Sequence, residues 1–274
     1  MTYSIVARDP NGGDVGVAVQ SHYFGAGWVV PWLEAGVGAV ATQAMAEMAH
    51  GPNGLRGLRE GGRPADVLQR LLDADDGSAT RQVAIVSADG QVAVHTGPSC
   101  IAHAGHVTGD GWAVQANMMR EPGVPEAMAE AFTGSDGPLA HRMLAALDAA
   151  EAAGGDVRGR QSAGLFVAPA AGKPWDRSPS LRVDDHPDPL VELRRLLEMH
   201  DCYARGEHGP AMGTNPEMRF WGAVGKAGEG DIDGARAELE AAYAADEGWR
   251  RLVERLPAAG LLPDEPGLVD RLTT

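Results

Sequence analysis

Lysine is almost absent from this chain of 274 residues, which has only Lys173 and Lys226 among its 23 basic residues. Acidic residues number 38, so the formal net charge is −15 at pH 7. Nucleic acids and anionic membrane surfaces are bound mainly through Lys and Arg, and this charge therefore argues against both as main partners. A lysine-based active site would have two candidates.

Cysteine is also scarce, because Cys100 and Cys202 are the only two and lie far apart in the sequence. They indicate no disulfide framework and no zinc-type cysteine pair. The sequence lacks an apolar run of about 18 residues and a basic segment followed by an apolar one at the N-terminus. We therefore expect a cytoplasmic protein without a membrane partner, a bound metal or a cofactor.

Hydrophobic residues make up 44% of the chain, which is ample for a core. Thr2–Arg8 and Asp14–Ser21 alternate polar and apolar residues on either side of the turn Asp9–Gly13, a pattern that predicts a β-hairpin. Gly36–Ala44 is small and apolar on both faces, as is typical of a buried strand. The apolar segment Val29–Trp32 before it is predicted to be a loop.

Periodicity and turn residues predict the remaining elements of the first two hundred residues. The predicted strands are Gln82–Ser87, Val92–Thr96, Gly111–Asn117, Ser162–Ala168 and Ser180–Asp184. The predicted helices are Pro52–Glu60, Pro64–Asp73, Val124–Phe132, Pro138–Ala153 and Pro189–His200. Blocks of strands separated by blocks of helices indicate the α+β class, with antiparallel sheets in a four-layer αββα sandwich.

The composition changes after His200, where a polar, glycine-rich linker precedes an apparent helical hairpin. The expected inner face of that hairpin includes Trp221, Leu239, Ala242 and Tyr243. We predict one domain over residues 1–205 and a small helical module over residues 206–274. So short a module is marginal alone, and we expect it to pack on the main domain or on a partner.

The chain begins Met1-Thr2, and the small second residue allows methionine aminopeptidase to remove Met1. The new terminus would carry a hydroxyl nucleophile and a free α-amine that takes its proton, so one residue would supply nucleophile and base. Many chains begin with the same dipeptide and make no chemical use of it.

Five runs of the sequence together resemble one family: TYSIVARD at Thr2–Asp9, GVGAVATQA at Gly36–Ala44, GWAVQAN at Gly111–Asn117, GGDVRGRQSA at Gly154–Ala163 and LRVDDHPDPLVEL at Leu181–Leu193. The chain is similar over about residues 2–200 to the domain of unknown function 1028 family, which is grouped with the N-terminal-nucleophile (Ntn) hydrolases. Its tail from about residue 210 is similar to a C-terminal module described in some members as peptidoglycan-binding, and also to a tetratricopeptide-like helical hairpin.

The resemblance implies an αββα sandwich and hydrolysis of an amide bond by Thr2. At the positions that match the family motifs, it implies that Asn117 acts with Thr2 in catalysis and that Gln43, Gln161 and Ser162 bind substrate. Side-chain amides suit an oxyanion site because they donate hydrogen bonds to the developing charge. Such amides at strand ends also commonly satisfy loop backbone groups, and both interpretations remain open for each.

Four further residues are candidates for substrate binding. His22 follows the second predicted strand and could orient substrate, and Arg8 could bind a carboxylate. Asp185 and His186 belong to the polar run Asp184–Pro189, which fits three interpretations: helix capping and loop support, support of the active site, or a metal site. The three histidines around residues 97–110 match no helical zinc spacing.

The aromatic-rich segment after Ser21 carries Tyr23, Phe24, Trp28 and Trp32. It could line a pocket or form an oligomer interface, and we expect a homo-oligomer. The function predicted from the sequence is an amidohydrolase that cleaves a carbon–nitrogen amide bond of a small polar molecule. The alternative is a non-catalytic binding or assembly protein on the same sandwich, and a third hypothesis is a metal-dependent hydrolase using Asp184, Asp185 and His186.

Overall fold

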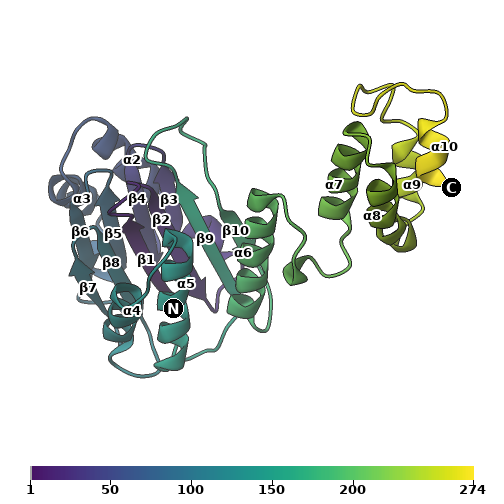
Figure 1. Ribbon diagram of the computed structural model, residues 1–274. Helices are drawn as coiled ribbons and strands as arrows, with labels where there is room; N and C mark the ends of the chain where they lie inside the picture. Colours follow the sequence, from purple (N-terminus) through teal and green to yellow (C-terminus); the bar gives the residue numbers. More distant parts are fainter. Residues whose placement is uncertain (1) are drawn as a thin grey trace. The chain divides into compact units, whose positions relative to one another are not determined.

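The computed structural model describes residues 2–274 (Figure 1). The chain forms two compact units, one ending at Arg194 and the other comprising Arg195–Thr274. The division falls inside helix α6, Pro189–Arg205, whereas the sequence analysis places the boundary after residue 205. Each unit is described by itself below.

The first unit contains two antiparallel sheets. The six-stranded sheet has the order β10-β9-β2-β1-β8-β7, with β1 Thr2–Arg8, β2 Val15–Ser21, β7 Gly105–Gly109, β8 Trp112–Asn117, β9 Ser162–Ala168 and β10 Ser180–Val183. The four-stranded sheet has the order β3-β4-β5-β6, with β3 Pro31–Glu34, β4 Gly38–Ala44, β5 Arg81–Ser87 and β6 Val92–Thr96. The predicted hairpin is confirmed, since β1 and β2 pair antiparallel from Tyr3 opposite Gln20 to Arg8 opposite Val15.

Each sheet carries helices on one face. Helix α5, Leu139–Ala152, contacts β1, β2 and β9, and α4, Val124–Thr133, contacts β7 and β8. Helices α2, His50–Arg59, and α3, Pro64–Asp73, contact the four-stranded sheet. The other faces of the two sheets meet, because β1 contacts both β4 and β5. The predicted mixture of helices with antiparallel sheets is therefore confirmed.

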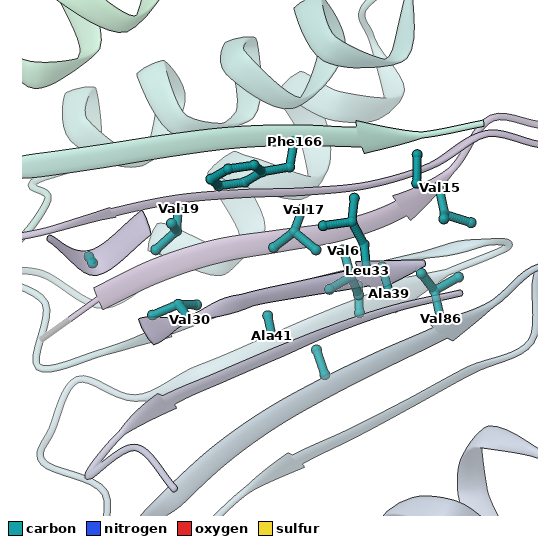
Figure 2. Close-up of a cluster of buried hydrophobic side chains, with 14 of the residues drawn as sticks. Val6, Val15, Val17, Val19, Val30, Leu33, Ala39, Ala41, Val86 and Phe166 are labelled. Atoms are coloured by element: carbon teal, nitrogen blue, oxygen red, sulfur yellow. The ribbon is translucent and has the colours of Figure 1, made fainter. Parts of the chain in front are cut away.

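The core between the sheets is built from small and β-branched side chains, as Figure 2 shows. Val17 and Val19 on β2 and Val6 on β1 face Ala39 and Ala41 on β4, and all five are fully buried. Their alternate neighbours face the helices instead, because successive residues of a strand point to opposite faces. Val40 and Ile85, for example, pack with Leu55 and Val67 of the helices.

The structure differs from the predicted elements mainly in three places. The helix predicted over Pro189–His200 continues to Arg205 as α6, into the segment predicted to be a linker. The predicted loop Val29–Trp32 is wrong, because helix α1, Ala26–Val29, leads directly into strand β3. Strand β7 is also missing from the prediction, since GHVTG is short and polar on its exposed positions. Both strands lie at sheet edges. Fewer of their side chains are buried there, so the pattern of polar and apolar residues that predicts a strand is weaker.

The second unit is helical: a 3₁₀ turn at Pro210–Met212 precedes α7 Glu217–Gly228, α8 Ile232–Ala245, α9 Gly248–Val253 and α10 Leu268–Thr273. Its core includes Phe220, Leu239 and Val253. The expected inner position of Trp221 is wrong, because Trp221 is 37% exposed while its neighbour Phe220 is buried against Trp249, with ring centroids 4.8 Å apart. Across residues 2–274, no helix has the length and apolarity needed to cross a membrane.

Candidate functional site

Thr2 begins the central strand β1 and lines a cavity of about 470 Å³. Its side chain is almost completely buried, and its Oγ1 donates a hydrogen bond of 3.1 Å to Ser21 Oγ. Ser21 ends the neighbouring strand β2, and Asn117, opposite Thr2 in the ladder, ends β8 on the other side. Three strand ends therefore place a threonine hydroxyl, a serine hydroxyl and a side-chain amide together.

Two amides hold the backbone of Thr2. Gln43 Nε2 donates to the Thr2 carbonyl oxygen at 3.2 Å, and Asn117 Nδ2 donates to the same oxygen at 3.3 Å. Gln43 comes from the four-stranded sheet and Asn117 from the six-stranded one. The two sheets thus fix the position of Thr2 jointly.

The amide of Gln43 belongs to a buried polar network between the sheets. Gln43 and Asn117 both donate to Gln82 Oε1, at 2.7 and 3.1 Å, and Gln43 Oε1 accepts from Ser4 Oγ at 2.7 Å. Gln115 Nε2 donates to Ser4 Oγ at 3.2 Å. All five side chains are at most 1% exposed. Buried amides are expensive unless they are bonded, so this network fixes the relative position of the two sheets.

The backbone is strained on both sides of the cavity. Among the non-glycine residues of 2–274, Ala44 and Met118 have positive φ, of 69° and 61°. Each directly follows a strand-end amide, Gln43 or Asn117, and each lines the cavity. Side chains other than glycine adopt this conformation at a cost of order 1 kcal/mol, and such strain gathers at functional sites.

The glycine-rich loop after α5 closes another side of the cavity. The buried carboxylate of Asp156 accepts hydrogen bonds from the backbone N–H groups of His22 and Arg158, at 2.9 and 2.8 Å. The Arg158 guanidinium, which lines the cavity, forms an ion pair with the same carboxylate at 3.2 Å. Asp156 therefore ties this loop to the end of β2.

The structure brings only some of the predicted site residues to the cavity. Thr2, Gln43 and Asn117 line it. Ser162 lies one layer behind, where its Oγ donates to the Tyr23 carbonyl at 2.6 Å and accepts from the Ala26 amide at 3.0 Å. Ser162 thereby supports the segment that forms one wall.

The other predicted binding residues do not line this cavity. Arg8 is at the far end of β1, about 20 Å along the strand from Thr2, and donates from Nε to the Ala88 carbonyl. Gln161 donates to the Asp185 carboxylate at 3.1 Å, while His186 Nδ1 accepts from the Asp188 amide. These contacts support the architectural interpretation of the polar run.

Metal chemistry receives no geometric support. Within the described residues 2–274, no three side chains of His, Cys, Asp or Glu gather as a metal site would require. Asp184 forms an ion pair with Arg182, and the His95 and His106 rings contact the Ser78 carbonyl and the Thr96 hydroxyl. Asp184 and the two histidines thus have partners of their own.

The sequence analysis does not identify several residues of the site. Cys100 lines the cavity, but burial raises the pKa of its thiol, and its Sγ donates to the Arg81 carbonyl, so it is a poor nucleophile. Cys100 and Cys202 are both free. Ser21 is a missed residue that the sequence does indicate, because it ends the predicted strand Asp14–Ser21, whose hairpin partner begins at Thr2.

Asp75 stabilises one wall of the cavity through Arg81. Its carboxylate accepts from Arg81 Nε at 2.8 Å, from the Gly77 amide at 2.8 Å and from His50 at 3.0 Å. Arg81 in turn donates to the Met45 carbonyl. The Arg81 guanidinium is the main reason that the pKa of Asp75 lies well below its usual range, with smaller contributions from Gly77 and His50.

We expect Asp75→Asn to lower the free energy of unfolding by about 1–2 kcal/mol at pH 7. A carboxyl whose pKa is lowered in the folded state stabilises it above the unfolded pKa of about 4 and loses that effect as the pH falls. The difference between wild type and variant should therefore shrink between about pH 5 and pH 3 in urea titrations. Asp66→Asn, which breaks an exposed pair with Arg63, is the matched control and should change little. A difference that stays constant with pH would contradict this account.

The fold and the cavity define an α+β protein with a buried, amide-supported threonine at the start of a central strand. A family model described as a family of unknown function (DUF1028) matches residues 2–193, and the chain belongs to this family. The protein SPO2555 from Silicibacter pomeroyi, a member of the same family, has a crystal structure to which this chain is similar. The identity is 33% and the TM-score 0.68, over 75% of this chain and 90% of that one.

The chain has a weaker structural similarity to Anbu (ancestral beta-subunit) from Yersinia bercovieri. Its identity is 9% and its TM-score 0.35, over 76% of this chain and 98% of that one, which is too low to indicate a shared fold. No curated protein matches the chain. The family description assigns no activity.

Proposed function

We propose that this protein is an N-terminal-nucleophile hydrolase that cleaves an amide carbon–nitrogen bond through Thr2 once Met1 has been removed. The observation that carries the proposal is the placement of Thr2: it begins a central strand and lines a cavity, its hydroxyl bonds to Ser21, and its backbone carbonyl is held by an amide from each sheet. The helix-covered pair of facing sheets supports assignment to the four-layer αββα architecture of that class.

In this mechanism Thr2 Oγ1 attacks the carbonyl carbon of the amide, and the α-amine of the same residue accepts the hydroxyl proton. The carbon–nitrogen bond then breaks, and the proton passes to the leaving amine. An ester between the acyl group and Thr2 remains. Water attacks this ester with the α-amine again as base, which releases a carboxylic acid and restores the threonine.

The neighbouring polar groups have distinct roles in the proposal. Ser21 accepts the hydrogen bond of the Thr2 hydroxyl in the structure and so holds its oxygen in place, and the hydroxyl turns toward the α-amine when its proton is transferred. Gln43 holds the Thr2 carbonyl. Both N–H groups of the Asn117 amide are engaged, with the Thr2 carbonyl and with Gln82. We assign its longer bond, of 3.3 Å to Thr2, as the one exchanged for the oxyanion in the transition state.

The remaining predicted residues act as supports in this proposal. Ser162 holds the wall around Tyr23, and His22 donates its backbone N–H to Asp156 in the loop that carries Arg158. Gln161, Asp185 and His186 join the end of that loop to the segment before α6. None of the five needs to touch the reacting atoms.

The proposal is tested by inserting a lysine between Met1 and Thr2. A large second residue prevents methionine removal, so Thr2 would lack its free α-amine while every side chain of the cavity remained. We expect amide hydrolysis to fall to background.

An alanine inserted at the same place is not a matched control. Met1 removal would leave Ala before Thr2, which should also inactivate the enzyme. The control is a chain without the inserted lysine, cut by a protease in vitro so that it begins with Thr2. This chain should be fully active. Hydrolysis by the lysine-inserted chain at the normal rate would contradict the mechanism.

One observation favours the alternative function of binding or assembly. Phe24 and Trp28 are 67% and 66% exposed on the segment between β2 and β3. Large exposed aromatic side chains commonly mark interaction surfaces, including those between copies of one chain. A protein that keeps Met1 in its own organism would favour this alternative.

A further inference from the structure

The walls of the Thr2 cavity differ from those expected for the small polar substrate of the sequence analysis. We propose that the molecule bound beside Thr2 is an amide that carries a flexible, uncharged apolar chain. The proposal rests on the proposed function for the position of the amide bond. The nature of the chain is argued from the walls alone.

Large apolar side chains surround the mouth of the cavity. Tyr23, Met45, Met48 and Ile101 all line it, and they are 37–62% exposed. Deeper in, the lining includes the buried Val30. Single exposed apolar residues are common on proteins, but four gathered around one cavity of about 470 Å³ fit the size and lining of a small-molecule site.

The cavity offers no unpaired charge to a polar substrate. Among the described residues that line it, the charged ones are Arg81 and Arg158. Arg81 forms an ion pair with Asp75 at 2.8 Å, and Arg158 forms one with Asp156 at 3.2 Å. A charged group of the substrate would have to compete with these carboxylates, whereas an apolar chain leaves both pairs intact.

The cavity combines adaptable walls with a fixed backbone. Met45, Met48 and Met118 are unbranched and refill irregular space around ligands of different lengths. The backbone beneath them is held: the Met45 amide donates to the Thr80 carbonyl at 3.3 Å, and the Met118 amide donates to the Ile101 carbonyl at 2.9 Å. Thr42 Oγ1 also donates to the Glu47 carbonyl at 3.1 Å. Such a site distinguishes apolar from polar chains more strongly than it distinguishes apolar chains of different shape.

The binding experiment uses the full chain with Thr2→Ala, which removes hydrolysis from the measurement. Straight-chain primary amides from acetamide to decanamide are titrated by calorimetry. N-alkyl acetamides of matching length are titrated in parallel, so that the apolar chain is tested on both sides of the amide bond. We expect the dissociation constant of at least one series to fall about three- to fourfold for each added methylene until the cavity is full. No dependence on length in either series would overturn the proposal.

A matched pair of variants locates the binding. Ile101→Asn places a polar group on the rim, and we expect it to weaken binding of the longest amide at least about fivefold. Val191→Asn makes a similar change at a residue of the same unit that is 60% exposed and does not line the cavity, and it should bind normally. Equal effects of the two variants would contradict the assignment to this cavity.

The same amides separate this inference from the proposed function. If binding depends on chain length but the processed wild type does not hydrolyse the amides, the apolar site is supported and the proposed hydrolase function is contradicted. Turnover of short polar amides without length-dependent binding would support the hydrolase and overturn the apolar site.

Discussion

Thr2→Ala should reduce amide hydrolysis by about 10⁴-fold in kcat/KM, because it removes the nucleophile while leaving the α-amine and the cavity in place. Thr2→Ser should retain much of the activity, since it keeps a hydroxyl nucleophile next to Ser21. Both replacements are small enough for Met1 to be removed, so processing is held constant. The measurement is steady-state hydrolysis of the amide series, with the mass of each chain recorded.

Stability distinguishes this catalytic effect from a folding defect. The Thr2 side chain makes one hydrogen bond to Ser21, so Thr2→Ala should cost about 1 kcal/mol of unfolding free energy. Thr108→Ala, on an exposed position of β7, is the control and should leave both properties unchanged. An alanine variant that hydrolyses amides at the wild-type rate would refute Thr2 as nucleophile.

Gln43→Leu should have the second largest effect, on stability and activity together. The leucine is similar in size, but it removes one hydrogen-bond partner from each of the Ser4 hydroxyl, the Gln82 amide oxygen and the Thr2 carbonyl at a fully buried position. A buried hydrogen bond contributes about 1 kcal/mol, so we expect the loss of three to lower the unfolding free energy by about 3 kcal/mol. Released from one of its two amides, Thr2 should move enough to lower kcat about 100-fold.

Gln161→Leu is the matched control for this prediction. It makes the same replacement at an amide with one exposed hydrogen bond, to Asp185, outside the cavity. We expect it to change the unfolding free energy by less than about 0.5 kcal/mol and to leave kcat unaffected. Urea denaturation and steady-state kinetics measure the two variants side by side. A Gln43→Leu chain as stable and active as Gln161→Leu would show that the buried network neither holds the sheets nor positions Thr2.

The sequence predicts the parts of the site that depend on one strand or one hairpin. Alternation predicts β1 and β2, and a period of two places Gln115 and Asn117 on one face of β8, where they bond with Ser4 and the carbonyl of Thr2. Strands β6 and β9 and helix α3 have the predicted bounds, because each is closed by clear turn residues.

The remaining features depend on how the two sheets pack. Gln82 meets Gln43 because the two residues are paired across β4 and β5, and it meets Asn117 because β5 faces β8; no local pattern contains either relation. Arg8 is close to Thr2 in the sequence but is separated from it in space by the length of the strand. The apolar walls come from segments around residues 23, 45, 101 and 118, and only folding gathers them around Thr2.

The most direct test of the central claim is the intact mass of the natively expressed protein together with its N-terminal sequence. The account predicts a chain that lacks Met1 and begins with an unmodified Thr2. A chain that keeps Met1, or that carries an acetylated terminus, would lack the α-amine required as base and would contradict the N-terminal-nucleophile mechanism.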